Sequence, residues 1–144
     1  MPVLKRLSDQ VRVGPQLSVE DVAALGREGV AVIINNRPDG EAFDQPTSAE
    51  IEAAAEQAGI AYRHIPVAGG AVTPQAVRQM ADALDEAEGP AVAFCRSGNR
   101  SSMLWALAQA GRQPAEAIIA AARDAGYDVS ALRPYLEGMD PSPR

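Results

Sequence analysis

The sequence contains only one cysteine, Cys95, and only one histidine, His64, among its 144 residues. A single cysteine excludes a disulfide within the chain and a zinc site built from several thiolates. A single histidine argues against a histidine-built metal centre and against a Ser-His-Asp triad. We therefore expect no bound metal and no other cofactor, and the lone thiol becomes the first candidate for a reactive group.

Basic side chains and long apolar runs are also scarce. The chain has 13 Lys and Arg residues against 19 Asp and Glu, a net charge of −6, which argues against nucleic-acid binding and against binding to a membrane surface. No apolar stretch reaches the roughly 18 residues that a membrane span requires, and the N-terminus lacks the apolar segment of a signal peptide. We expect a cytoplasmic protein, in which a lone cysteine stays reduced.

The length suits one core, and we expect a single domain over residues 1–144. Short apolar segments alternate with helical patterns that begin at capping residues and end at glycine. This alternation predicts an α/β fold, a mainly parallel sheet flanked by helices on both faces. Strands are expected at 11–13 (a short edge strand), 30–34, within 60–67 and at 91–94, and helices at about 18–28, 48–58, 74–87, 100–109, 114–125 and 128–137.

The segment Ala91–Ser101 carries the strongest chemical signal. Its apolar start is typical of a buried strand, which delivers Cys95 to the carboxyl edge of the sheet, where α/β proteins place their sites. Gly98 allows the following loop to curl, so that successive backbone N–H groups and the start of the next helix face one point. Such a cluster of donors lowers the pKa of a thiol. The sequence therefore predicts that Cys95 is a thiolate nucleophile in an anion-binding loop.

The polar side chains of this loop extend the prediction. Arg100 can form two parallel hydrogen bonds to a bound oxyanion, and Ser101 or Ser102 can donate a hydroxyl toward the sulfur or the leaving group. Arg96 is expected to point outward and meet an anionic substrate. The other expected substrate-binding positions of the loop are Ser97, Gly98 and Asn99. A cysteine after a buried strand can also be a small core residue, but a neighbourhood this polar makes a poor core.

Two further loops follow strands at the same predicted edge. Arg37 and Asp39 lie after the strand at 30–34, and His64 ends the strand within 60–67. Because the carboxyl ends of parallel strands share one edge, these side chains can line the site and bind substrate. Alternatively, Pro38-Asp39-Gly40 is simply a turn, and His64 is a structural histidine held by hydrogen bonds. The sequence leaves both interpretations open.

Several of these motifs resemble those of known families. The run Cys-Arg-Ser-Gly-Asn-Arg-Ser at 95–101 resembles the active loop of rhodanese-type sulfurtransferases and the phosphate loop of cysteine-dependent tyrosine and dual-specificity phosphatases. With Ile33–Gly40 and Tyr62–Val67, it makes the stretch from Val11 to Ala108 similar to the bacterial beta-lactamase hydrolase-like family. That resemblance implies a dual-specificity-phosphatase fold. It also implies one of two activities. Members of the family are discussed as phosphatases and, where they are fused to or encoded beside persulfide-handling enzymes, as sulfurtransferases.

Two departures from the phosphatase pattern bear on the chemistry. Four residues separate Cys95 from Arg100, one fewer than in the phosphatase loop, and rhodanese-type loops share the shorter spacing. A smaller loop suits one sulfur atom better than a phosphoryl group. The loop at 67–72, where the small phosphatases carry an aspartate as general acid, has no acidic residue, although Asp39 or Asp44 can approach from another loop. We therefore predict sulfane-sulfur transfer through a Cys95 persulfide.

Two alternatives remain open at this point. One is a phosphatase that acts through a Cys95 phosphocysteine, and the other is a non-catalytic sensor of an anion or a persulfide. The expected partners are a small anionic sulfur donor with a thiol acceptor, or a phosphoester substrate, together with a persulfide-handling partner enzyme. Nucleic acid and membranes are not expected partners.

Overall fold

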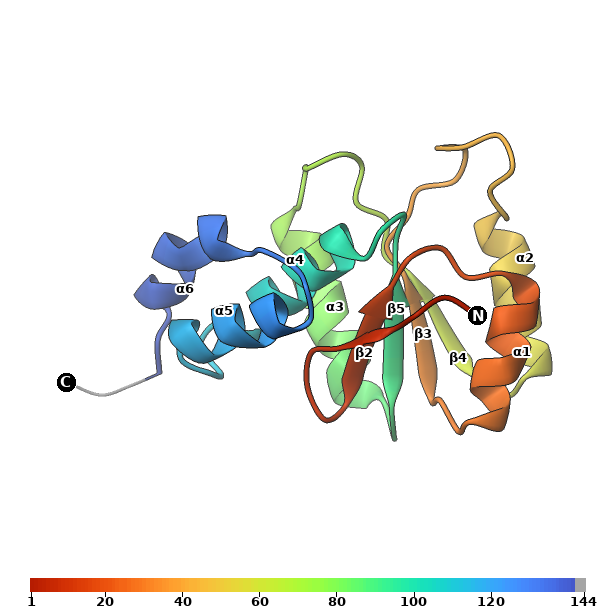
Figure 1. The fold of residues 1–144 in the computed structure, drawn as a ribbon, viewed down its shortest axis with the longest axis horizontal. Helices are drawn as coiled ribbons and strands as arrows, with labels where there is room; N and C mark the ends of the chain where they lie inside the picture. The colour runs from red at the N-terminus through yellow and green to blue at the C-terminus, as the bar shows by residue number, and fades with distance from the viewer. Residues whose placement is uncertain (142–144) are drawn as a thin grey trace.

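A five-stranded sheet forms the centre of the protein (Figure 1). The structure, a computed structural model, describes residues 1–141. The strands are Lys5–Arg6 (β1), Val11–Gly14 (β2), Val32–Asn35 (β3), Ala61–His64 (β4) and Ala91–Phe94 (β5). They lie in the order β1-β2-β5-β3-β4, and every neighbouring pair is parallel except β1 with β2. The predicted mainly parallel sheet is therefore confirmed.

Helices cover both faces of this sheet (Figure 1). They are Val19–Arg27 (α1), Ser48–Gln57 (α2), Pro74–Glu86 (α3), Asn99–Gln109 (α4), Ala115–Asp124 (α5) and Arg133–Gly138 (α6). On one face, α1 and α2 pack over a core that includes Ile51 and Phe94. On the other face, α3, α4 and α5 pack over a second core that includes Met80 and Trp105. The two cores explain why β3 and β5 are buried along their whole lengths.

The helices begin where the capping residues predict. The side chains of Ser18 and Thr47 accept hydrogen bonds from backbone N–H groups three residues on, and each completes a capping box. Thr73 caps α3, with Pro74 in the first turn. These local signals mark the starts of α1, α2 and α3 in the sequence.

The strands differ from the prediction in three ways. The strand at 11–13 is not an edge strand, because β1 pairs outside it and β5 pairs on its other side. Two exposed basic residues make up β1, a length and composition that give no strand pattern. The strand expected at 30–34 occupies 32–35 instead, since the N–H of Val30 still donates to Leu25 O at the end of α1.

The helix expected at 128–137 divides in two. A 3-10 turn covers Ser130–Leu132, and α6 follows directly. The Asp128 carboxylate accepts the backbone N–H of Ser130 at 2.9 Å, so the first turn begins two residues later than predicted. Pro134 lies in the first turn of α6, where its missing N–H costs no hydrogen bond.

The carboxyl ends of β3, β4 and β5 meet at one edge of the sheet. Asn35 is in register with both Phe94 and His64, so the three strands end together. The loops that follow them rise from the same edge in Figure 1. Cys95 is the first residue after β5, which places the predicted nucleophile where the loop after β3 can reach it.

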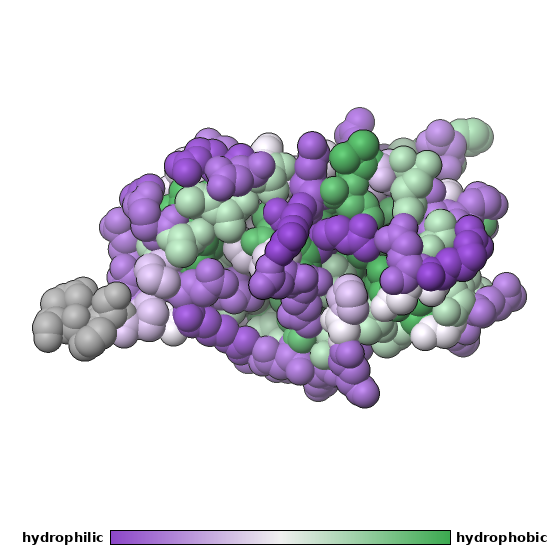
Figure 2. Space-filling model, turned by 60° about the horizontal axis from the view of Figure 1, so that its bottom comes forward, coloured by the Kyte–Doolittle hydropathy of each residue, from purple (hydrophilic) through white to green (hydrophobic). Residues whose placement is uncertain are grey.

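The surface carries both polar and apolar side chains. Figure 2 shows polar side chains spread over the visible face, with apolar residues in small groups among them. The large hydrophobic side chains that remain exposed are Met1, Val3, Val19, Phe43, Tyr135 and Met139. Among residues 1–141, no helix has the length and apolar character needed to cross a bilayer.

Candidate active site

Cys95 lies at the bottom of a cradle of backbone amides. Its side chain is fully buried, and the N–H of Gly98 donates to Sγ at 3.1 Å. Burial alone raises the pKa of this thiol, but hydrogen bonds from the backbone outweigh it and lower the pKa of Cys95 below its ordinary value. The backbone donors belong to Ser101, Ser97, Gly98 and Arg100. The sulfur is thus held as a thiolate more readily than a free cysteine.

Gly98 makes this cradle possible. Its φ of +99° lies in the left-handed region, which allows the chain to reverse between β5 and α4. The carbonyl of Gly98 then accepts the backbone N–H of Ser102 at 2.9 Å and the Ser102 hydroxyl at 2.8 Å. The Ser102 hydroxyl therefore stabilises the start of α4 and does not donate a hydrogen bond to the sulfur. The buried Ser101 hydroxyl has no hydrogen-bond partner within residues 1–141.

Arg100 is held by a carboxylate that the sequence analysis missed. Its Nη1 and Nη2 atoms each donate to Glu41 at 2.8 Å, and Nη1 also donates to Val67 O at 2.7 Å. Hydrogen bonds from Arg100, with a smaller effect of Arg37, lower the pKa of Glu41 to about 2. Glu41 is therefore ionised at neutral pH. An anionic substrate must compete with it for the guanidinium.

Arg37 reaches the site through Glu41. Its side chain is almost fully buried, and Nε donates to Glu41 Oε1 at 3.1 Å while Nη1 donates to Gln16 Oε1 at 2.9 Å. Arg37 thus orients the carboxylate that holds Arg100. Within residues 1–141, no hydrogen bond joins Arg37 to Cys95 itself.

Asp39 and His64 are engaged in local contacts. Asp39 Oδ1 accepts the backbone N–H of Ser48 at 2.7 Å, at the start of α2. His64 Nε2 lies 2.9 Å from Arg37 O and ties the end of β4 to the loop after β3. These contacts agree with the turn and structural-histidine interpretations.

The remaining loop residues face outward. Arg96, Ser97 and Asn99 are exposed, and the N–H of Asn99 donates to Ser97 Oγ at 3.3 Å. Their side chains are therefore accessible to an incoming anion. The backbone of Ser97 donates a hydrogen bond that lowers the pKa of Cys95.

A proton donor for a leaving group is not evident in this arrangement. The loop at 67–72 contains no acidic residue, and its first carbonyl accepts from Arg100. Glu41 is ionised, and Asp39 serves the start of α2. Within the part of the chain that the structure describes, no group of three or more His, Cys, Asp or Glu residues is placed to hold a metal ion.

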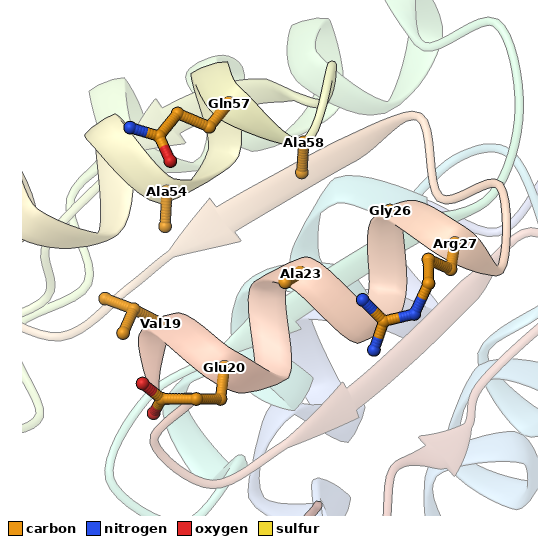
Figure 3. A pocket seen from close by; sticks show the side chains of 8 residues that line it. All are labelled: Val19, Glu20, Ala23, Gly26, Arg27, Ala54, Gln57 and Ala58. Carbon is orange, nitrogen blue, oxygen red and sulfur yellow. The ribbon is translucent and has the colours of Figure 1, made fainter.

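A groove of about 570 Å³ lies elsewhere, between α1 and α2 (Figure 3). Small residues line much of it, and a Cβ on Gly26 would lie 2.8 Å from that of Ala58. None of its lining residues belongs to the loops after β3, β4 or β5. It is separate from the loop at 95–101 that surrounds Cys95.

Comparison with known proteins identifies the family. Residues 3–112 match the family model described as beta-lactamase hydrolase-like protein, phosphatase-like domain. A beta-lactamase hydrolase-like protein of Agrobacterium fabrum is 34% identical over 134 residues, which cover 92% of this chain and 31% of that protein. A relative from Xylella fastidiosa is 32% identical over 133 residues, 91% of this chain and 31% of its own. The chain thus spans about a third of the length of these curated relatives.

Solved structures share the fold. A candidate phosphatase from Neisseria meningitidis has a TM-score of 0.80 at 33% identity, with 94% of this chain and 96% of that chain covered. A kinase-associated phosphatase, solved with serine in place of its catalytic-site cysteine, has a TM-score of 0.73 at 16% identity, covering 94% and 91%. At such low identity the second comparison shows the fold alone.

These comparisons confirm the predicted family resemblance and the fold of the cysteine-dependent phosphatases. They do not support the prediction of a sulfurtransferase, and they fit the phosphatase alternative better. At the level they do show, the chain is a phosphatase-like domain with the fold of the cysteine-dependent phosphatases. With the model match over residues 3–112 and relatives more than 30% identical over nine-tenths of its length, the chain belongs to the beta-lactamase hydrolase-like family, as its phosphatase-like domain.

Proposed function

We propose that this chain transfers sulfane sulfur through a persulfide on Cys95. The observation that carries the proposal is the short loop, whose four residues between Cys95 and Arg100 bring backbone N–H groups onto the sulfur. A cradle centred on one sulfur atom, with Gly98 N only 3.1 Å from Sγ, suits a single anionic sulfur more than a phosphoryl group with three oxygens.

The reaction has two displacement steps. The Cys95 thiolate attacks the sulfane sulfur of a donor such as thiosulfate, a new S–S bond forms, the donor's S–S bond breaks, and sulfite leaves with the electron pair. An acceptor thiolate then attacks the terminal sulfur, leaves as a persulfide and restores the Cys95 thiolate. Neither leaving group needs a proton, which suits a site in which Glu41, the carboxylate bound to Arg100, is ionised.

Arg100 is the group that we expect to hold the sulfonate end of the donor. The two guanidinium nitrogens that now donate to Glu41 can donate instead to a bound anion of similar geometry. The exposed Arg96 adds positive charge at the entrance. The acceptor is then a small thiol or a persulfide-handling enzyme in the cytoplasm.

A phosphatase is the second candidate, and the comparisons favour it. Besides the Neisseria structure, one neighbour at 21% identity is PTPMT1, solved in complex with PI(5)P. In this reaction Cys95 forms a bond to phosphorus, the bond to the ester oxygen breaks, and water later hydrolyses the phosphocysteine. An alkoxide leaving group needs a proton. The candidate therefore applies best to phosphoesters with a stable leaving anion, such as aryl phosphates.

Intact mass after incubation with thiosulfate or polysulfide tests the proposal. We expect the protein to gain one sulfur, about 32 Da, and the Cys95→Ser variant to gain none. Arg112→Ala is the control, because it alters an exposed side chain that lies after the end of α4, outside the loop, and keeps the thiol. It should form the adduct as the unaltered protein does.

The other two functions predict different results. Release of phosphate from an aryl phosphate that depends on Cys95, with no sulfur adduct, would establish the phosphatase instead. Absence of both activities in a folded protein would leave the anion or persulfide sensor.

A further inference from the structure

Tyr127 contacts the reactive loop from the C-terminal part of the chain. It follows α5 and lies outside the stretch that the family model matches. Its hydroxyl donates to the carbonyl oxygen of Ser97 at 3.0 Å. The backbone N–H of Tyr127 donates to Ala122 O at 2.8 Å, and the ring packs against the main core, so the residue is fixed by the end of α5.

The bond to Ser97 acts on the sulfur through a single peptide unit. The Ser97 carbonyl and the Gly98 N–H are the two ends of one planar peptide. One end accepts from Tyr127, and the other donates to Cys95 Sγ at 3.1 Å. A hydrogen bond to the carbonyl holds the peptide plane in this orientation and polarises the N–H toward the sulfur.

The packing around Gly98 supports the same arrangement. A Cβ at this position would overlap the Tyr127 hydroxyl and would lie 2.9 Å from Tyr127 Cζ. The phenol therefore sits directly over the α-carbon of Gly98. Burial, and then the negative charge of Cys95, raise the pKa of Tyr127, so the phenol remains a protonated donor at neutral pH.

We propose that Tyr127 is a positioning residue for the reactive sulfur, which holds the 97–98 peptide so that its N–H stabilises the Cys95 thiolate. This inference rests on the proposed function only in requiring a thiolate at Cys95. It applies equally to sulfur transfer and to phosphoryl transfer.

The test is the pH dependence of Cys95 alkylation by iodoacetamide in Tyr127→Phe. Loss of one hydrogen bond should raise the midpoint by about half to one pH unit. Below the midpoint the rate should fall about two- to fourfold, because the thiolate fraction decreases while each thiolate becomes slightly more nucleophilic. The plateau at high pH should rise slightly. A variant that merely loosened the loop would instead react faster at every pH.

Tyr135→Phe is the matched control, since Tyr135 is exposed on α6 and no hydrogen bond joins it to the loop within residues 1–141. Its alkylation profile should equal that of the unaltered protein. An unchanged midpoint in a folded Tyr127→Phe would overturn the proposal. The alkylation needs no sulfur donor, so this outcome is distinct from failure of the persulfide test.

A reciprocal measurement does not depend on the tyrosine variant folding. Because charge on Cys95 opposes ionisation of Tyr127, Cys95→Ser should lower the titration midpoint of the Tyr127 phenol, followed by NMR. A midpoint that stays the same would show that the two groups are not coupled, and it would count against the proposal.

Discussion

Arg100→Ala is expected to lower kcat/KM about 100- to 1,000-fold, the loss seen when one preorganised donor to a developing charge is removed. Hydrogen bonding to Glu41, and then the negative charge of Cys95, raise the pKa of Arg100, and its guanidinium presents a planar fork to an anion. Steady-state turnover of thiosulfate with a thiol acceptor measures the effect. If the enzyme proves to be a phosphatase, the same loss applies to aryl phosphate.

Arg112→Ala provides the control for this prediction. Arg112 also forms a two-pronged pair, with Asp85 at 2.7 and 3.0 Å, but it lies after α4 and away from the loop. This substitution should leave turnover within about twofold of that of the unaltered protein, because exposed ion pairs contribute little to stability. Arg100→Lys should recover only part of the activity, since an ammonium keeps the charge and loses the fork. Equal activity of Arg100→Ala and Arg112→Ala would refute the assigned role.

Gly98→Ala is expected to reduce turnover about 100-fold, the effect of moving reacting groups by about 1 Å. Two causes act together. The φ of +99° disfavours any residue with a Cβ, and that Cβ would overlap the Tyr127 hydroxyl. The loop must shift to relieve both, which withdraws the amides from Cys95. The backbone cost alone is about 1–2 kcal/mol of stability.

Gly29→Ala is a control that separates the effect of backbone strain from the effect of changing a residue in the loop around Cys95. Gly29 has a φ of +88° at the end of α1, and a Cβ there would meet no atom within 4 Å. This variant should lose about the same 1–2 kcal/mol in urea unfolding and yet retain normal turnover. If Gly98→Ala loses no more activity than Gly29→Ala, the geometry of the loop is not what makes the sulfur reactive.

The parts of the fold that follow local rules could be predicted from the sequence. Capping residues such as Thr47 mark helix starts, and the apolar run before Cys95 marks a buried strand. Strand β1 could not be predicted, since a two-residue basic segment pairs only because β2 offers it a free edge. The predicted start of β3 was two residues too early, because the N–H of Val30 still donates to Leu25 O at the end of α1.

The candidate site also has some features that the local sequence predicts and others that depend on distant parts of the chain. The backbone cradle around Cys95 follows from the strand, Gly98 and the helix start, which are contiguous in sequence. Glu41 and Tyr127 lie 59 and 30 residues from their partners in the loop, Arg100 and Ser97. Nothing in a polar loop or at a helix end distinguishes such residues beforehand, since their roles arise only when the chain folds.

The central claim is that the folded chain stabilises Cys95 as a thiolate. The most direct measurement is the pH midpoint of Cys95 alkylation in the folded protein, compared with the same chain unfolded in urea. Because the backbone hydrogen bonds lower the pKa of Cys95 despite its burial, the folded midpoint should lie below the unfolded one. A folded midpoint at or above the unfolded value would contradict the account, because burial would then outweigh the amides and the thiol would be an inert core residue.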